Sequence, residues 1–81
     1  MKKEELKKLI EEGHEIEFEY KNKKYSITYG EINGEEVISF CEFDKDTVEV
    51  KTFDELLFVR YNDFVFGNIL DNIKDDKTWI I

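Results

Sequence analysis

The chain has 81 residues, of which 41% are hydrophobic and 15% are aromatic. This length supports one small core, and this content is too apolar for a disordered chain, so we predict a single domain over residues 1–81. Twelve basic and twenty acidic residues give a net charge of −8. A field of this sign repels phosphates, so direct nucleic-acid binding is not expected, whereas association with a basic protein surface is favoured.

The expected location is the cytoplasm. No apolar run approaches the ~18 residues of a membrane helix, and the first residues lack the hydrophobic stretch of a signal peptide. Cys41 is the only cysteine, which excludes an internal disulfide framework. The chain has no Ala, Pro or Gln, and eleven of its twelve basic residues are Lys. Such AT-rich codon usage is typical of a low-GC bacterium or one of its phages.

Residues 3–12 predict an amphipathic helix. Leu6, Leu9 and Ile10 lie on one face at helical spacing among Lys and Glu residues. Gly13 follows, at the position where a glycine commonly ends a helix.

Three segments with alternating apolar and polar residues come next, at 15–20, 25–29 and 36–43. Two-residue turns at Asn22-Lys23 and Asn33-Gly34 would join them as an antiparallel meander. The first turn pairs Tyr20 with Tyr25, Phe18 with Ile27 and Ile16 with Tyr29; the second turn pairs Tyr29 with Ile38 and Ile27 with Phe40.

Both registers agree on one face of this meander, which we predict to be buried. A slip of one residue in either hairpin would scatter its apolar side chains over both faces. The opposite face carries Glu17, Ser26, Cys41 and Phe43 among others and is predicted to be less buried. The predicted buried set is Ile16, Phe18, Tyr20, Tyr25, Ile27, Tyr29, Ile38 and Phe40.

Shorter elements are predicted in the second half of the chain. Residues 48–50 indicate a fourth strand, and the T-x-x-E pattern of residues 52–55 is typical of a capping box at the start of a short helix. Residues 58–66 fit either a hairpin around Asn62-Asp63 or a helix end and a turn. Residues 79–81 fit either an edge strand or a segment under the helices. The spacing of Phe66, Ile69, Leu70 and Ile73 predicts a second short helix.

The predicted fold class is therefore α+β. It consists of an N-terminal helix, a three- or four-stranded antiparallel meander and two short C-terminal helices packed on one face of the sheet.

Catalytic and metal-binding patterns are nearly absent. His14 and Cys41 are the only residues of their types, whereas structural zinc needs about four such ligands. Nucleophilic catalysis needs a base beside the nucleophile, and nothing in the sequence pairs them. Asp44, Asp46 and Glu49 form a D-x-D-x-x-E run that lacks the central glycine of a calcium loop. We expect no enzymatic activity, no cofactor and no metal.

Two other features favour protein binding. Carboxylates recur on the predicted hairpin tips and around the capped helix, and aromatic residues are concentrated at 58–66, where one or two could be exposed as anchors. The acidic candidates are Glu35, Glu36, Glu42, Asp44, Asp46, Glu49, Asp54 and Glu55, in a series that also includes Glu31; the apolar anchor candidates are Phe58, Tyr61 and Phe64.

The predicted function is a non-enzymatic acidic protein-binding module. Its general character is similar to that of small acidic phage proteins that inhibit restriction or CRISPR nucleases by occupying a basic groove, although no motif identifies such a family. The alternative is a small-molecule-binding domain in which Tyr20, Tyr25 and Trp79 line an aromatic pocket or dimer cleft. A further alternative is self-association as a homodimer through the open strand face or residues 58–66.

Overall fold

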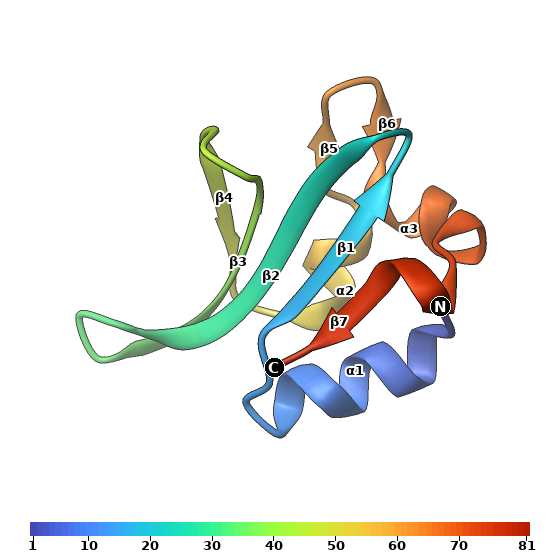
Figure 1. Cartoon of the computed structure of the whole chain (residues 1–81). Helices are drawn as coiled ribbons and strands as arrows, with labels where there is room; N and C mark the ends of the chain where they lie inside the picture. The colour runs from blue at the N-terminus through green and yellow to red at the C-terminus, as the bar shows by residue number, and fades with distance from the viewer.

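The computed structural model describes all 81 residues and is built around a five-stranded antiparallel sheet (Figure 1). The strand order is β4-β3-β2-β1-β7. The longest hairpin, β2–β3, extends away from the helices at its tip (Figure 1). The strands are β1 (Ile16–Tyr20), β2 (Lys23–Ile32), β3 (Glu35–Glu42), β4 (Thr47–Val50) and β7 (Thr78–Ile80).

Short helices and a small hairpin complete the fold. Their buried residues join those of the sheet in one core cluster, so they pack on a single sheet face. This arrangement confirms the predicted α+β class. No helix is long and apolar enough to cross a membrane. The elements are α1 (Lys3–Glu11), α2 (Phe53–Leu57), α3 (Phe66–Ile69), the 3-10 turns η1 (Leu70–Asn72) and η2 (Asp75–Lys77), and the hairpin strands β5 (Arg60–Tyr61) and β6 (Phe64–Val65).

The predicted buried face of the sheet is confirmed. Six of its eight residues are buried, and Tyr20 and Tyr29 pack against the core from partly exposed positions. The rings of Phe18, Tyr25 and Phe40 stack with centroids 5.2 to 6.2 Å apart. Stacked rings of this kind contribute beyond their buried area, so this cluster ties β1, β2 and β3 together.

The predicted register of the β2–β3 hairpin is also confirmed. Tyr29 lies opposite Ile38, and the ladder continues to the tip. Asn33 and Gly34 have φ values of 53° and 83°. Two successive positive φ angles define the type I′ turn, whose twist matches that of the flanking strands.

The predicted register of the β1–β2 hairpin is wrong by two residues. Phe18 pairs with Tyr25 instead of Ile27. The turn is formed by Lys21 and Asn22, with φ values of 51° and 65°, rather than by Asn22 and Lys23. Either turn places one lysine and one asparagine at positive φ, and in the observed register the rings of Phe18 and Tyr25 stack with centroids 5.2 Å apart. A shift of two residues leaves every side chain on its face, so the buried set is unchanged.

The second half of the chain follows its pattern closely. Residues 48–50 lie within β4, and Thr52 Oγ1 accepts a hydrogen bond of 3.1 Å from Glu55 N at the start of α2. Residues 58–66 contain the hairpin rather than a helix end alone, and α3 with η1 forms the second helical segment. Residues 78–80 form the edge strand β7 beside β1, which raises the strand count above the predicted three or four.

Candidate functional site

The negative charge of the protein is concentrated in residues 31–55. This segment carries nine carboxylates and two lysines, a net charge of −7 out of the total of −8. It comprises the end of β2, all of β3 and β4, and the start of α2. Because β4 is an edge strand, the segment occupies one side of the sheet, which we call the acidic side (residues 31–55).

The predicted acidic residues are distributed along this side. Glu35 and Glu36 lie at the β2–β3 tip, and Glu42, Asp44 and Asp46 lie at the opposite end of β3, around the β3–β4 turn. Glu49 lies on β4 between these ends, and Asp54 and Glu55 lie in the first turn of α2. The structure therefore places the eight carboxylates along one edge region rather than in one compact site.

Few of the carboxylates in the protein are neutralised. Only Glu12, Glu19 and Glu35 lie within 4.0 Å of a cationic nitrogen or a histidine nitrogen. On the acidic side the single ion pair joins Lys51 Nζ to Glu35 Oε2 at 2.9 Å, between two exposed side chains. The other carboxylates of this side have no ion-pair partner within 4.0 Å, although Glu36 accepts a hydrogen bond from Tyr29 Oη and Glu42 accepts one from Asn62 Nδ2.

The β3–β4 turn is held by residues of the β5–β6 hairpin. Tyr61 Oη accepts a hydrogen bond of 3.0 Å from Glu42 N and donates one of 2.7 Å to Asp46 O. Asn62 Nδ2 donates to Tyr25 Oη at 2.9 Å and to Glu42 Oε1 at 3.1 Å. These bonds orient the turn that carries Asp44. Lys23, Lys45 and Arg60 line the same shallow hollow as Glu42, Asp44 and Asp46, so the formal charge of the hollow is balanced.

The three apolar anchor candidates differ in how far their side chains are exposed. Phe58 is 80% exposed, and its neighbours Leu56 and Val59 are buried, so the backbone holds its ring outward. Tyr61 is partly buried, with its ring edge-on to Phe40 at 5.2 Å. The prediction of Phe64 as an exposed anchor is wrong. Its side chain is only 8% exposed and packs against the aromatic core, so it is not available to a partner.

The aromatic set of the small-molecule alternative does not form one pocket. Tyr25 is buried in the core, where burial raises the pKa of its hydroxyl above the ordinary range despite the hydrogen bond from Asn62. Tyr20 packs on the same face, edge-on to Phe64, whereas Trp79 lies opposite Glu17, whose side chain points to the other face of the sheet. These three residues therefore do not line a single pocket within one chain.

A different pocket involves Trp79. It has a volume of about 300 Å³ on the sheet face that the helices leave open, and it is lined by Glu17, Phe18, Lys24, Phe43 and Trp79. Sequence reasoning missed this group because Trp79 comes from β7, whose place beside β1 is not encoded locally. The alternation of β1 and β3 did put Glu17 and Phe43 on this less buried face.

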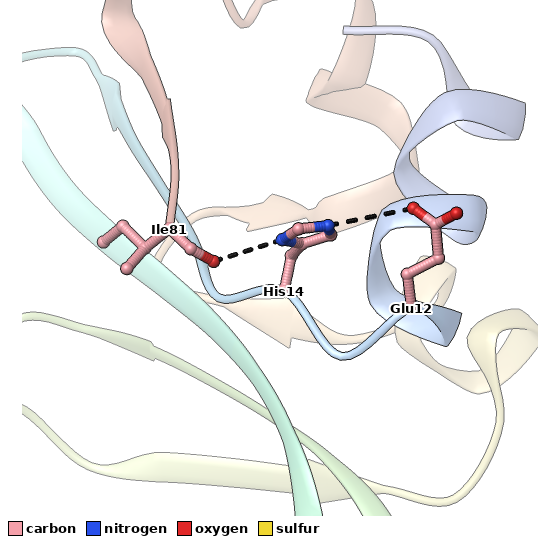
Figure 2. Close-up of polar contacts among 3 residues, drawn as sticks. All are labelled: Glu12, His14 and Ile81. Atoms are coloured by element: carbon pink, nitrogen blue, oxygen red, sulfur yellow. Dashed lines mark hydrogen bonds and ion pairs between the residues drawn. The ribbon is translucent and has the colours of Figure 1, made fainter.

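His14 and Cys41 have separate surroundings. His14 Nδ1 lies 3.3 Å from Ile81 O, and Nε2 lies 3.8 Å from Glu12 Oε1 (Figure 2). Cys41 Sγ lies 3.5 Å from Ser26 Oγ. No group of three or more His, Cys, Asp or Glu side chains is placed to hold a metal ion. The imidazole of His14 and the thiol of Cys41, the two side-chain types most often used as nucleophile or base, therefore make only local polar contacts with separate neighbours.

Known proteins were compared with this chain by family, by sequence and by structure. No family model, no curated protein and no solved structure matches it.

Proposed function

We propose that this chain is a non-enzymatic binding module whose acidic side occupies a basic surface of a protein partner. The partner class that fits best is a nucleic-acid enzyme, because a groove that binds phosphates is lined by Lys and Arg. A carboxylate-rich surface that enters such a groove competes with DNA or RNA for it, so the module would act as an inhibitor.

The observation that carries this proposal is the concentration of charge. A net charge of −7 lies on one side of the sheet, and only one carboxylate there has an ion-pair partner. Complementary charge of this kind accelerates association and selects the partner, more than it sets the final affinity. Because exposed charges are screened beyond about 8 Å at physiological ionic strength, binding should weaken steeply with salt.

A capture experiment with two charge-matched variants tests the proposal. The first variant carries Asp44→Lys, Asp46→Lys and Glu49→Lys on the acidic side. The control carries Glu4→Lys, Glu5→Lys and Glu12→Lys around α1, so both have the same net charge. Each protein is immobilised and exposed to a nuclease-treated lysate of a low-GC bacterium at low salt.

We expect the unmodified protein and the α1 control to capture a nucleic-acid enzyme that is released by high salt and displaced by added duplex DNA. The acidic-side variant should lose this capture. Equal loss in both variants would show that net charge alone attracts the partner, and undiminished capture by the acidic-side variant would exclude the acidic side as the contact surface.

A further inference from the structure

The pocket beside Trp79 is built by three neighbouring strands and the residue that follows β3. Trp79 of β7 lies opposite Glu17 of β1, and Glu17 lies opposite Ser26 of β2. Phe43 N donates a backbone hydrogen bond of 2.9 Å to Lys24 O, which fixes Phe43 beside β2. The sheet backbone thus forms the floor of the pocket, and two aromatic side chains stand on opposite sides of it.

Both aromatic walls are available to a ligand. Trp79 is 45% exposed and Phe43 is 37% exposed. All the helices pack on the other face of the sheet, so no helix covers the two rings, and the Lys24 side chain lies over the Trp79 ring. An indole and a phenyl ring that flank one hollow provide stacking surfaces for a flat group.

The charge of the pocket favours a cation. Partial burial raises the pKa of Glu17 above its ordinary value, and hydrogen bonding and charge repulsion from Glu15 raise it further, whereas Lys24 lowers it. The pocket lining itself holds one carboxylate, Glu17, and one ammonium group, Lys24, and Glu15 beside Glu17 adds a second negative charge outside the lining. Lys24 Nζ lies 6.0 Å from the centre of the Trp79 ring, which shows that a cation can approach the indole face here.

We propose that this pocket, with Glu17 between Trp79 and Phe43, binds the guanidinium group of an arginine side chain of the basic partner. This inference rests on the proposed function and names the group that is recognised. A guanidinium is flat and weakly hydrated, so it stacks on aromatic rings, and its paired N–H donors match a carboxylate such as that of Glu17. Phe43 lies between Glu42 and Asp44, so the pocket adjoins the acidic side.

Lys24 competes with the incoming arginine in this arrangement. Its ammonium is a compact and strongly hydrated charge that makes weaker use of the flat aromatic surface than a guanidinium does. Removing this competitor should therefore tighten arginine binding, whereas removing the Glu17 charge should weaken it. An anionic ligand would show the reverse pattern, so the two substitutions identify the sign of the charge that the pocket binds.

The test uses the fluorescence of Trp79, which is the only tryptophan in the chain. The full-length protein is titrated with N-acetyl-arginine amide at constant ionic strength, with N-acetyl-lysine amide as the comparison probe. We expect a saturable change with the arginine probe and none with the lysine probe at the same concentrations. Glu17→Gln should weaken binding about threefold to fivefold, as expected for an exposed ion pair. Lys24→Gln should tighten it, and Glu4→Gln, a control on α1, should leave it unchanged.

Several results would overturn the inference. These are the absence of a saturable change with the arginine probe, an equal response to the lysine probe, or an opposite order of the Glu17 and Lys24 variants. Glu17→Gln relieves repulsion from Glu15, so misfolding does not explain a loss of binding, and Lys24→Gln supplies an independent readout. If the acidic-side variant loses its captured partner but the protein does not bind the arginine probe, this inference fails and the proposed function stands. If the protein binds the arginine probe but the acidic-side variant still captures the partner, the arginine pocket stands and the proposed function fails.

Discussion

The two edges of the sheet present opposite surfaces to solvent. The β4 edge belongs to the acidic side, with its net charge of −7. The β7 edge exposes three consecutive apolar residues, Trp79, Ile80 and Ile81. The segment that leads into β7, residues 74–77, holds two lysines and two aspartates and is electrically balanced.

This difference bears on why the protein is acidic. Charges that serve only solubility are best placed around exposed apolar surface and along open edges, where they prevent aggregation. Here the residues that lead into β7 are electrically balanced, although Glu17 and Glu19 lie on the neighbouring strand β1, and nine of the twenty carboxylates lie in the acidic side at the far end of the strand order. Because β4 is itself an open edge, its carboxylates also fit a solubilising role, and the capture experiment described above distinguishes this role from the proposed recognition of a basic surface.

The largest expected effect comes from the core that both edges share. Phe40 is fully buried and lies opposite Ile27 on β2 and Val48 on β4. Phe40→Ala should lower the free energy of unfolding by about 3–5 kcal/mol, since it removes a large buried ring and leaves a cavity. Urea denaturation measures the loss. A cost below about 1 kcal/mol would show that the β4 edge is not anchored through this ring.

The next effect concerns the start of α2 on the acidic side. Thr52 Oγ1 accepts a hydrogen bond from Glu55 N and donates one of 3.2 Å to Glu55 Oε1. Thr52→Ala should cost about 1 kcal/mol of stability, as expected for the loss of an N-cap. Thr52→Ser retains the hydroxyl and serves as the control in thermal denaturation. Equal melting temperatures for the Ala and Ser variants would contradict a role for the cap.

A smaller effect is expected at the β7 edge. Ile80 is 50% exposed, so Ile80→Lys should change stability by no more than about 0.5 kcal/mol. The added charge should raise solubility because it protects an open edge strand. Light scattering at high protein concentration and a urea titration measure the two properties. A loss of several kcal/mol would mean that Ile80 supports the core rather than a free edge.

The smallest effect concerns Glu17, the acidic residue opposite Trp79. Its pKa is raised in the folded protein, so its contribution to stability is present below the unfolded value of 4.5 and is lost as the pH rises through the folded value. Glu17→Gln should therefore raise the melting temperature at pH 7, and the gain should shrink below pH 4.5. Calorimetry at both pH values checks this sign, and an equal gain at both would refute it.

Local patterns predicted much of the fold. Asn33-Gly34 specified its hairpin turn and register, because few residue pairs tolerate two positive φ angles. The Lys21-Asn22 turn carries a weaker signal, and alternation cannot distinguish registers that differ by two residues, so the β1–β2 register was wrong. In residues 58–66 the sequence indicated many aromatic side chains, but not that Phe64 would be buried while Phe58 would be exposed.

The candidate surfaces can be separated in the same way into features that local patterns predict and features that depend on tertiary contacts. Side-chain periodicity and composition are local properties, so they predicted the apolar face of β1, β2 and β3 and the segment that carries the charge. The pairing of β7 with β1, and the pocket that Trp79 shares with Glu17 and Phe43, arise from contacts between distant segments in the folded chain. That pairing joins opposite ends of the chain, and its stability comes from packing and hydrogen bonds between distant segments, which no local pattern encodes.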